Sequence, residues 1–281
     1  MVGELTWQKR MFGLWLPLVF LFVFALFPFV WMAATSLKPD AELYNPNAPA
    51  LTIQHPSLVH YIELLKETNF LLWTANTMLV AVIATAISLL LGTMLAYPLA
   101  RMRFPGSALL AIAVAVSYLV PQTLLFVPMS DLVNRMHIGN TLSAVILTYP
   151  TLLVPFCAWL LMGYFKTVPK DLEEAALIDG ASRWRAMTRV ILPLCMPGFI
   201  SAGIFAFTLS QNEFLYALMF LNRSEIRTIP VGITTEMIRG DSFYWGQLMA
   251  GALLGSLPVA LIYSFFVKYY VAGLTAGSVK G

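Results

Sequence analysis

The chain has 281 residues, of which 59% are hydrophobic and only 11% are charged, and its mean hydropathy is +0.77. A soluble domain carries about 25% charged residues, so this composition excludes an ordinary soluble protein and indicates an integral membrane protein. The formal net charge of +3 does not indicate a nucleic-acid-binding protein, because the basic residues lie between apolar runs and form no polar basic face.

Six apolar runs follow one another along the chain. Each has about 19–26 residues, which is enough for a helix to cross about 30 Å of hydrocarbon. The first run is too long for a signal peptide and is predicted to be a retained span. Residues 1–13 and 272–281 are predicted to be tails that precede and follow one membrane domain, 14–271, along the chain. The predicted spans are about 14–34, 72–97, 109–127, 142–164, 197–221 and 248–270.

The distribution of Lys and Arg residues predicts the orientation in the membrane. With six spans, both termini lie on one side, together with the short link at 101–106 and the longer loop at 165–193. That side carries most of the basic residues, and by the positive-inside rule it is cytoplasmic. We therefore expect a multi-pass membrane protein whose termini and 165–193 loop face the cytoplasm.

The loop at 165–193 is the longest charge-rich stretch, and it is predicted to hold two short helices. Asp171 is a candidate N-cap for the first helix, with Glu174 three residues further on. Gly180 is predicted to end that helix, because glycine accepts the left-handed conformation needed just past a helix end. Ser182 is predicted to cap the second helix.

Within this loop, the run Glu174–Ala176, Gly180, Leu192 and Pro193 stand at the spacing of an E-A-A-x3-G-x9-I-x-L-P signature. The chain thereby resembles the membrane subunits of ABC importers of bacterial type, and its one departure is Val190 where isoleucine is usual. The resemblance implies an all-α membrane protein with six transmembrane helices, the type I ABC importer permease architecture and a cytoplasmic coupling helix.

In that family the coupling helix docks in a cleft of a separate ATPase subunit, and the resemblance implies the same role for the first helix of the loop. The acidic residues there can pair with arginines of the partner, and a glycine at the helix end allows close backbone approach. The residues expected to couple to the ATPase subunit are Glu173, Glu174, Ala175, Ala176, Asp179, Gly180, Leu192 and Pro193.

The carboxyl-terminal sequence G-L-T-A-G-S-V-K-G resembles the end of maltose-type sugar permeases, whose tail reaches into the ATPase interface. Thr275, Gly277 and Lys280 are the residues expected to make that contact, and a frayed terminus is the alternative. The pair at 212–213 resembles the same branch, although Gln211 stands where tryptophan is usual there. The resemblance implies four kinds of partner: a second homologous permease subunit, two ATP-binding subunits, an extracytoplasmic solute-binding protein and a sugar.

Polar side chains within spans are costly in lipid, so they tend to face a cavity or a neighbouring helix. Hydroxyl, amide and aromatic groups suit a neutral sugar, which offers many hydroxyls and flat apolar faces. Hydrogen bonding between helices is the alternative role. The candidate substrate-pathway residues are Tyr118, Gln122, Tyr149, Gln211, Asn212 and Glu213.

Motifs for nucleotide or metal chemistry are not found in this chain. It has neither a G-x-x-x-x-G-K-[ST] phosphate loop nor an H-E-x-x-H zinc motif. We therefore expect no catalytic residue, metal or cofactor here, with ATP and Mg²⁺ held by the partner ATPase subunits. Cys157 and Cys195 lie in or beside apolar runs and are expected to be buried free thiols.

The leading hypothesis is a non-catalytic permease subunit of the bacterial inner membrane. It would form half of the translocation pathway of an ATP-driven importer of a sugar, most simply a di- or oligosaccharide. A polyol, a glycerol phosphate or a peptide is the alternative solute. An ion-driven secondary carrier is disfavoured, because it would want titratable residues deep in the spans and only Glu213 qualifies. A membrane scaffold would explain the spans but not the signature.

Overall fold

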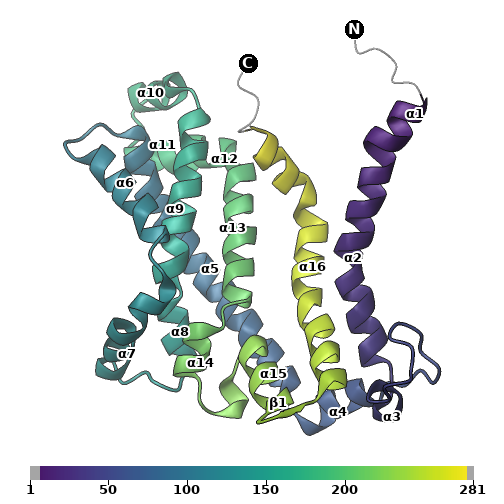
Figure 1. Cartoon of the computed structure of the whole chain (residues 1–281). Coiled ribbons are helices and arrows are strands. Elements are labelled where there is room, and N and C mark those ends of the chain that lie inside the picture. The colour runs from purple at the N-terminus through teal and green to yellow at the C-terminus, as the bar shows by residue number, and fades with distance from the viewer. Residues whose placement is uncertain (1–6, 277–281) are drawn as a thin grey trace. The chain divides into compact units, whose positions relative to one another are not determined.

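The computed structural model describes residues 7–276, and nearly all of its regular structure is helical (Figure 1). The chain divides into two compact units, one formed by residues up to 70 with 233–256, and the other by residues 71–232 with those from 257 onward. The elements in chain order are α1 (Trp7–Arg10), a π-helical turn (Met11–Trp15), α2 (Leu16–Ser36), α3 (Asp40–Leu43), α4 (Val59–Glu67), α5 (Phe70–Arg101), α6 (Ser107–Tyr118), a 3₁₀ turn (Gln122–Leu125), α7 (Phe126–Arg135), α8 (Leu142–Thr148), α9 (Pro150–Thr167), α10 (Lys170–Ile178), α11 (Arg183–Ala186), a π-helical turn (Met187–Ile191), α12 (Leu192–Leu194), α13 (Met196–Gln211), α14 (Leu215–Phe220), a 3₁₀ turn (Ser224–Ile226), α15 (Ile229–Met237), β1 (Ile238–Arg239), β2 (Ser242–Phe243) and α16 (Trp245–Ala276).

Four helical segments within the described residues are long and apolar enough to cross a membrane, namely 11–36, 70–101, 142–167 and 245–267. Two further pairs of helices pass the same test together but are bent. The pair 107–118 and 122–135 bends by 97°, and the pair 183–194 and 196–211 bends by 83°. Six spans result if each bent pair counts as one, so the predicted all-helical membrane fold is confirmed while two of its spans are not straight rods.

The predicted spans at 109–127 and 197–221 are both interrupted. In the first, α6 ends at Tyr118, and Pro121 takes up extended backbone with φ −59° and ψ 130°. Proline cannot continue a helix by backbone hydrogen bonding, and it restricts the residue before it. In the second, α13 ends at Gln211 and α14 begins at Leu215. Hydropathy averaged over the length of a span does not reveal these breaks, although the polar run 210–213 lies at the second one.

The unit built on residues 71–232 is a helical bundle in which two glycines allow close approach between helices. Gly92 of α5 faces Cys157 of α9, and Gly198 of α13 faces the ring of Tyr164 in α9. Figure 1 shows α10 and α11 at one end of this bundle and α7, α8 and α14 at the other. The core next to α10 is made of fully or nearly fully buried side chains that include Tyr97, Leu161, Phe165, Met187 and Ile191.

The other unit folds an irregular loop around two buried charged side chains. Lys38 is 3% exposed, and its ammonium group donates to the carbonyl oxygens of Pro49 and Ala50 at 2.6 and 2.8 Å. The Glu42 carboxylate accepts the backbone N–H groups of Gln54 and His55 at 3.0 and 3.1 Å. These contacts satisfy both charges, as burial requires, and they tie the loop at 45–58 to the end of α2.

A short hairpin of β1 and β2 follows α15, and it is absent from the sequence prediction of an all-α chain. The strands pair antiparallel, with Ile238 opposite Phe243 and Arg239 opposite Ser242. Gly240 in the turn has φ +58°, a conformation that favours glycine. Each strand has only two residues, too few to give a readable alternation of apolar and polar side chains.

Candidate functional site

Helix α10 is the element predicted to couple to an ATPase subunit, and its two ends are defined differently. It begins after Pro169, which makes no side-chain cap, so the prediction of Asp171 as N-cap is wrong: Asp171 lies inside the first turn. Proline takes the extended backbone that precedes a helix, and this sets the start one residue before Asp171. The acidic first turn still suits the positive end of the helix dipole.

The carboxyl end of α10 agrees with the prediction. Gly180 has φ +85°. Its N–H donates to the carbonyl oxygen of Leu177 at 3.1 Å, and the N–H of Ala181 donates to Ala176 at 2.9 Å. This pair of bonds is the Schellman arrangement, which requires a left-handed residue just past the helix. The prediction for Ser182 is also confirmed, because its Oγ accepts the N–H of Arg185 at 3.3 Å.

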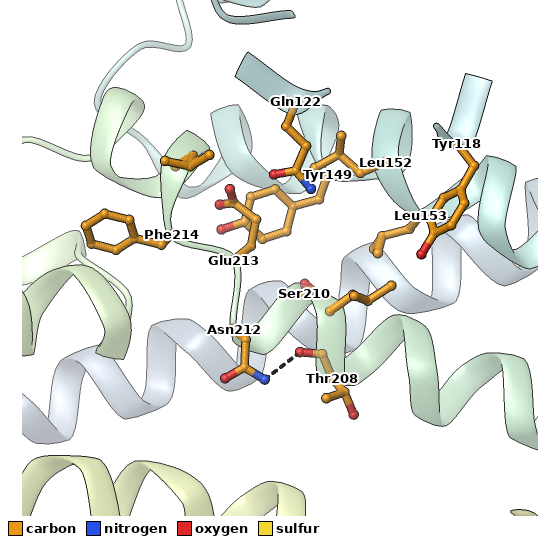
Figure 2. A pocket seen from close by; sticks show the side chains of 12 residues that line it. Tyr118, Gln122, Tyr149, Leu152, Leu153, Thr208, Ser210, Asn212, Glu213 and Phe214 are labelled. Atoms are coloured by element: carbon orange, nitrogen blue, oxygen red, sulfur yellow. Dashed lines mark hydrogen bonds between the residues drawn. The ribbon is translucent and has the colours of Figure 1, made fainter. Parts of the chain in front are cut away.

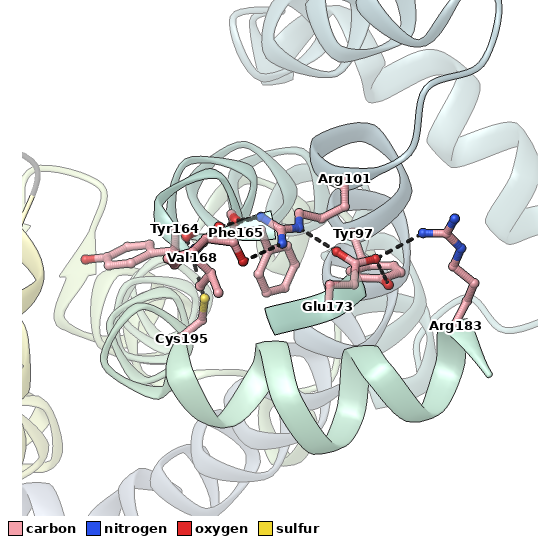
Figure 3. Close-up of polar contacts among 9 residues, drawn as sticks. Tyr97, Arg101, Tyr164, Phe165, Val168, Glu173, Arg183 and Cys195 are labelled. Carbon is pink, nitrogen blue, oxygen red and sulfur yellow. Dashed lines mark hydrogen bonds and ion pairs between the residues drawn. The ribbon is translucent and has the colours of Figure 1, made fainter. Parts of the chain in front are cut away.

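Glu173 fixes the inner face of α10 to the bundle. The Tyr97 hydroxyl donates to Oε1 at 2.6 Å, and Arg101 Nε donates to Oε2 at 2.7 Å (Figure 3). Arg183 Nη1 also donates to Oε1 at 3.1 Å, from the helix that follows Gly180. The residue is 4% exposed. A single carboxylate therefore joins α10 to the end of α5 and to α11.

Arg101 extends this connection to α9. Its Nη1 donates to the carbonyl oxygens of Phe165 and Val168 at 3.1 and 2.6 Å, and its Nη2 donates to that of Pro169 at 3.2 Å. These carbonyls lie at or just beyond the end of α9, where a helix leaves acceptors unpaired and its dipole attracts a cation. The planar guanidinium holds α5, α9 and α10 together because it has several donors in a fixed geometry.

The electrostatics of Glu173 follow from this surrounding. Burial by itself would raise the pKa of its carboxyl group. The hydrogen bonds from Tyr97 and Arg101, the charge of Arg101 and the hydrogen bond from Arg183 more than offset burial, so the pKa lies below its ordinary value of 4.5. Glu173 is thus an ionised, internally paired residue. This differs from its predicted pairing with arginines of a partner.

Most of the other residues predicted to couple are exposed. Ile178, between them on α10, is 85% exposed. Helix α10 therefore has one face anchored to the bundle and one exposed face that is partly apolar. The predicted residues that are exposed are Glu174, Ala175, Asp179, Gly180 and Pro193, and those that are partly buried are Ala176 and Leu192.

A cavity of about 680 Å³ opens beside α10. Basic side chains from the end of α5, the link after it, the start of α10 and the start of α11 line it, together with Glu173 and Glu174. Tyr97, Arg101 and Arg183 were not predicted as site residues. From the sequence, Arg101 and Arg183 are only two of the cytoplasmic charges that set the orientation. The lining residues are Arg101, Met102, Arg103, Phe104, Lys170, Glu173, Glu174, Leu177 and Arg183.

A second cavity, of about 370 Å³, lies within the bundle (Figure 2). It brings together five of the six predicted pathway residues, which come from the broken regions around Pro121 and Gln211 and from the start of α9. Gln211 is buried and does not line this cavity. The lining residues are Tyr118, Gln122, Tyr149, Leu152, Leu153, Thr208, Leu209, Ser210, Asn212, Glu213, Phe214 and Leu215.

Glu213 has a structural role as well as a place in this cavity. Its Oε1 and Oε2 accept the backbone N–H groups of Tyr216 and Ala217 at 2.8 and 3.1 Å. These N–H groups open α14 and would otherwise have no partner within that helix. Figure 2 shows the ring of Tyr149 beside the Glu213 carboxyl group. The break after α13 therefore places the Glu213 carboxyl group in the wall of the cavity.

The cysteines, the carboxyl-terminal residues and a metal site are the other features that the sequence analysis considered. Cys157 and Cys195 are buried and free, as predicted. Thr275 lies in the last turn of α16, because this helix continues to Ala276 and includes backbone that the sequence predicted to be a flexible tail. Gly277 and Lys280 lie outside the described residues. Among the residues described, no group of three or more His, Cys, Asp and Glu side chains is placed to hold a metal ion.

Comparisons with known proteins agree with this picture. Residues 88–275 match the family of the binding-protein-dependent transport system inner membrane component. The chain is 38% identical over 264 residues to the sulfoquinovosyl glycerol transport system permease protein SmoH of Agrobacterium fabrum, which covers 93% of this chain and 91% of SmoH. It is 33% identical over 261 residues to the trehalose/maltose transport system permease protein MalG of Thermococcus litoralis, which covers 92% and 93% of the two chains.

The fold is similar to that of a chain in the crystal structure of a bacterial ABC transporter involved in the import of the acidic polysaccharide alginate. The TM-score is 0.78 at 18% sequence identity, and the match covers 95% of this chain and 99% of that chain.

The membrane helices, the cavity beside the helix breaks at Pro121 and after Gln211, and the similarity to transport permeases place this chain in the class of ABC importer permease subunits. The chain belongs to the family of binding-protein-dependent transport system inner membrane components. The resemblance stated from the signature in the coupling loop is thereby confirmed.

Proposed function

We propose that this chain forms half of the translocation pathway of an ATP-driven importer of a di- or oligosaccharide. In this proposal α10 receives the movement of an ATPase subunit and passes it to the spans. The observation that carries it is the Glu173–Arg101 pair, which ties α10 to the ends of α5 and α9 by short, buried bonds. Because both side chains are buried and held by several hydrogen bonds, a movement of α10 would be transmitted to both helices.

The docking surface in this proposal is the exposed side of the coupling loop. Ile178 offers an apolar contact, and Glu174 and Asp179 offer carboxylates that can pair with arginines of the partner. Glu173 is not part of this surface, because its oxygens are already paired within the chain. The carboxyl-terminal contact proposed for Thr275, Gly277 and Lys280 stands on the sequence resemblance alone.

The complete transporter in this proposal contains a second homologous permease, two ATPase subunits that hold ATP and Mg²⁺, and an extracytoplasmic solute-binding protein. Both termini and α10 face the cytoplasm. The sugar class is supported by the printed substrates of the relatives above, and by a cavity lined with hydroxyl, amide and aromatic groups. In this proposal the chain is a transport component without a catalytic group of its own, which its family supports, and ATP is held by the partners because the chain has no phosphate loop.

The test is ATP-dependent sugar uptake by the whole transporter in proteoliposomes. Glu174→Ala and Gly180→Asp should each lower uptake and weaken retention of the ATPase subunits during purification, with normal insertion in the membrane. Gly163→Ala is the matched control, because Gly163 is exposed within α9 and an added Cβ meets no atom within 4 Å. Normal uptake by Gly180→Asp in an intact assembly, or uptake that survives ATP depletion, would contradict the proposal.

A further inference from the structure

The cavity of Figure 2 has a one-sided set of ionisable side chains. Glu213 is its one ionisable carboxyl group, and the described residues that line it include no lysine, arginine or histidine. The other polar groups are neutral hydroxyls and amides, and the remaining surface is leucine and phenylalanine. An anionic ligand group that entered this cavity would lose its hydrating water and would meet no cationic side chain in return.

The polar groups on the wall are suited to ligand hydroxyls. Ser210 is 3% exposed, and its Oγ is itself buried and has no hydrogen-bond partner within the structure. Asn212 donates through Nδ2 to the carbonyl oxygen of Thr208 at 2.9 Å, which fixes the amide and leaves its Oδ1 as an acceptor. Glu213 presents further acceptor oxygens. The acceptor oxygens of Asn212 and Glu213 bind O–H donors well, but they repel the oxygens of a sulfonate or carboxylate.

The relatives transport substrates of both kinds, and the lack of a cationic side chain among the described lining residues favours the uncharged kind. Sulfoquinovosyl glycerol carries a sulfonate group and alginate is described as acidic, whereas trehalose and maltose are uncharged. We infer that the part of the pathway formed by this chain accepts uncharged glycosides and rejects anionic ones. The inference rests on the proposed function and names the substrate class of the same cavity. Identity alone would favour the anionic class, because SmoH is the more similar of the two relatives described above.

The test uses the whole transporter in proteoliposomes with pairs of glycosides that differ by one charge. Glucosylglycerol and sulfoquinovosyl glycerol form such a pair, with a hydroxyl group in one and a sulfonate in the other. Trehalose and maltose are each paired with a counterpart that carries one uronic carboxylate. We expect the neutral member of each transported pair to be carried at least about tenfold faster. An anionic member carried as fast as its neutral partner, or faster, would overturn the inference.

A variant connects this preference to the cavity. Asn212→Lys places a cation on the wall at an exposed position, and should raise the anionic-to-neutral uptake ratio by about tenfold. Asn222→Lys is the control, because Asn222 is exposed outside the cavity and makes the same change of charge. Assembly of each variant is checked by size-exclusion chromatography. An assembled Asn212→Lys transporter with an unchanged ratio would overturn the inference, whereas ATP-independent uptake would instead overturn the proposed function.

Discussion

The guanidinium Nε of Arg101 lies 2.7 Å from Oε2 of Glu173, and the two side chains are 2% and 6% exposed. The residues are 72 positions apart in the sequence, one at the end of a span and the other in the coupling helix. The same guanidinium donates to carbonyl oxygens at the end of α9. Because three elements meet at this pair, its removal should affect both the stability of the bundle and the transmission of movement from α10.

Removal of one partner leaves the other as an unpaired buried charge. Arg101→Met should therefore lower the free energy of unfolding of the purified subunit in detergent by about 3–5 kcal/mol. The double variant Arg101→Met/Glu173→Leu should recover part of that loss, because it removes both charges. The control is Arg135→Met, which breaks an exposed ion pair with Asp131 at 2.8 Å and should cost at most about 1 kcal/mol. Equal losses from the buried and the exposed pair would contradict this reading.

The depressed pKa of Glu173 predicts a dependence of stability on acid. A carboxyl group whose pKa is lower in the folded than in the unfolded chain stabilises the fold above the unfolded value, and this contribution is lost as the pH falls through the folded pKa. The ordinary value is 4.5 and the folded value lies below it. The difference in unfolding free energy between the parent protein and Glu173→Gln should be constant at neutral pH and should shrink as the pH falls below 4.5. A difference that grew as the pH fell would contradict the lowered pKa of Glu173.

Gly180 should be sensitive for a reason of backbone geometry alone. Its φ is +85°, and a Cβ added there meets no atom within 4 Å. Gly180→Ala should therefore cost about 1–2 kcal/mol of strain, which comes from the left-handed conformation, while Gly180→Asn should cost less because asparagine tolerates it. Gly163→Ala, also in open space but inside a helix, should be neutral or stabilising. Thermal unfolding of the three variants ranks them, and a ranking with Asn below Ala would contradict the geometry.

Close packing between α9 and α13 gives a further prediction. A Cβ at Gly198 would overlap the ring of Tyr164, whereas one at Gly203 would meet only the end of the Leu89 side chain at 3.3 Å. Gly198→Ala should cost about 1–3 kcal/mol through overpacking, and Gly203→Ala should cost less, because a leucine methyl group can move. Unfolding of the two variants in detergent measures both. If the two substitutions cost the same, α9 and α13 are not packed through Gly198.

The sequence predicts the parts of this fold that depend on local chemistry. The span at 72–97, the ends set by Gly180 and Ser182, and the free thiols follow from hydropathy, conformational preference and motif spacing. It fails where a partner distant in the chain decides. Nothing near Glu173 in the sequence indicates that Tyr97 and Arg101 bind it. The break at Pro121 is visible only as a proline, and its 97° bend depends on packing.

The cavity shows the same division. Hydroxyl, amide and carboxyl groups in apolar runs predict that five of its lining residues face a common space. Leu152 and Phe214 are missed, because an apolar side chain in an apolar span gives no signal of its own. Gln211 is predicted with its neighbours, but successive residues on a helix point about 100° apart, and Gln211 is directed into the bundle.

Crosslinking from position 178 tests directly whether α10 docks on an ATPase subunit. Ile178 is 85% exposed on α10, so Ile178→Cys in the assembled transporter should crosslink to a copurifying ATPase subunit, and Tyr44→Cys, at a 52% exposed position in the loop predicted to lie outside the cell, should not. The native cysteines are buried and should not react with the crosslinker. We expect a crosslink to the ATPase subunit at position 178 and none at position 44. The docking of α10 on the ATPase subunit would be contradicted if position 178 reacted with a membrane-impermeant thiol reagent added outside intact cells, or if it gave no crosslink in a transporter that hydrolyses ATP and imports its substrate.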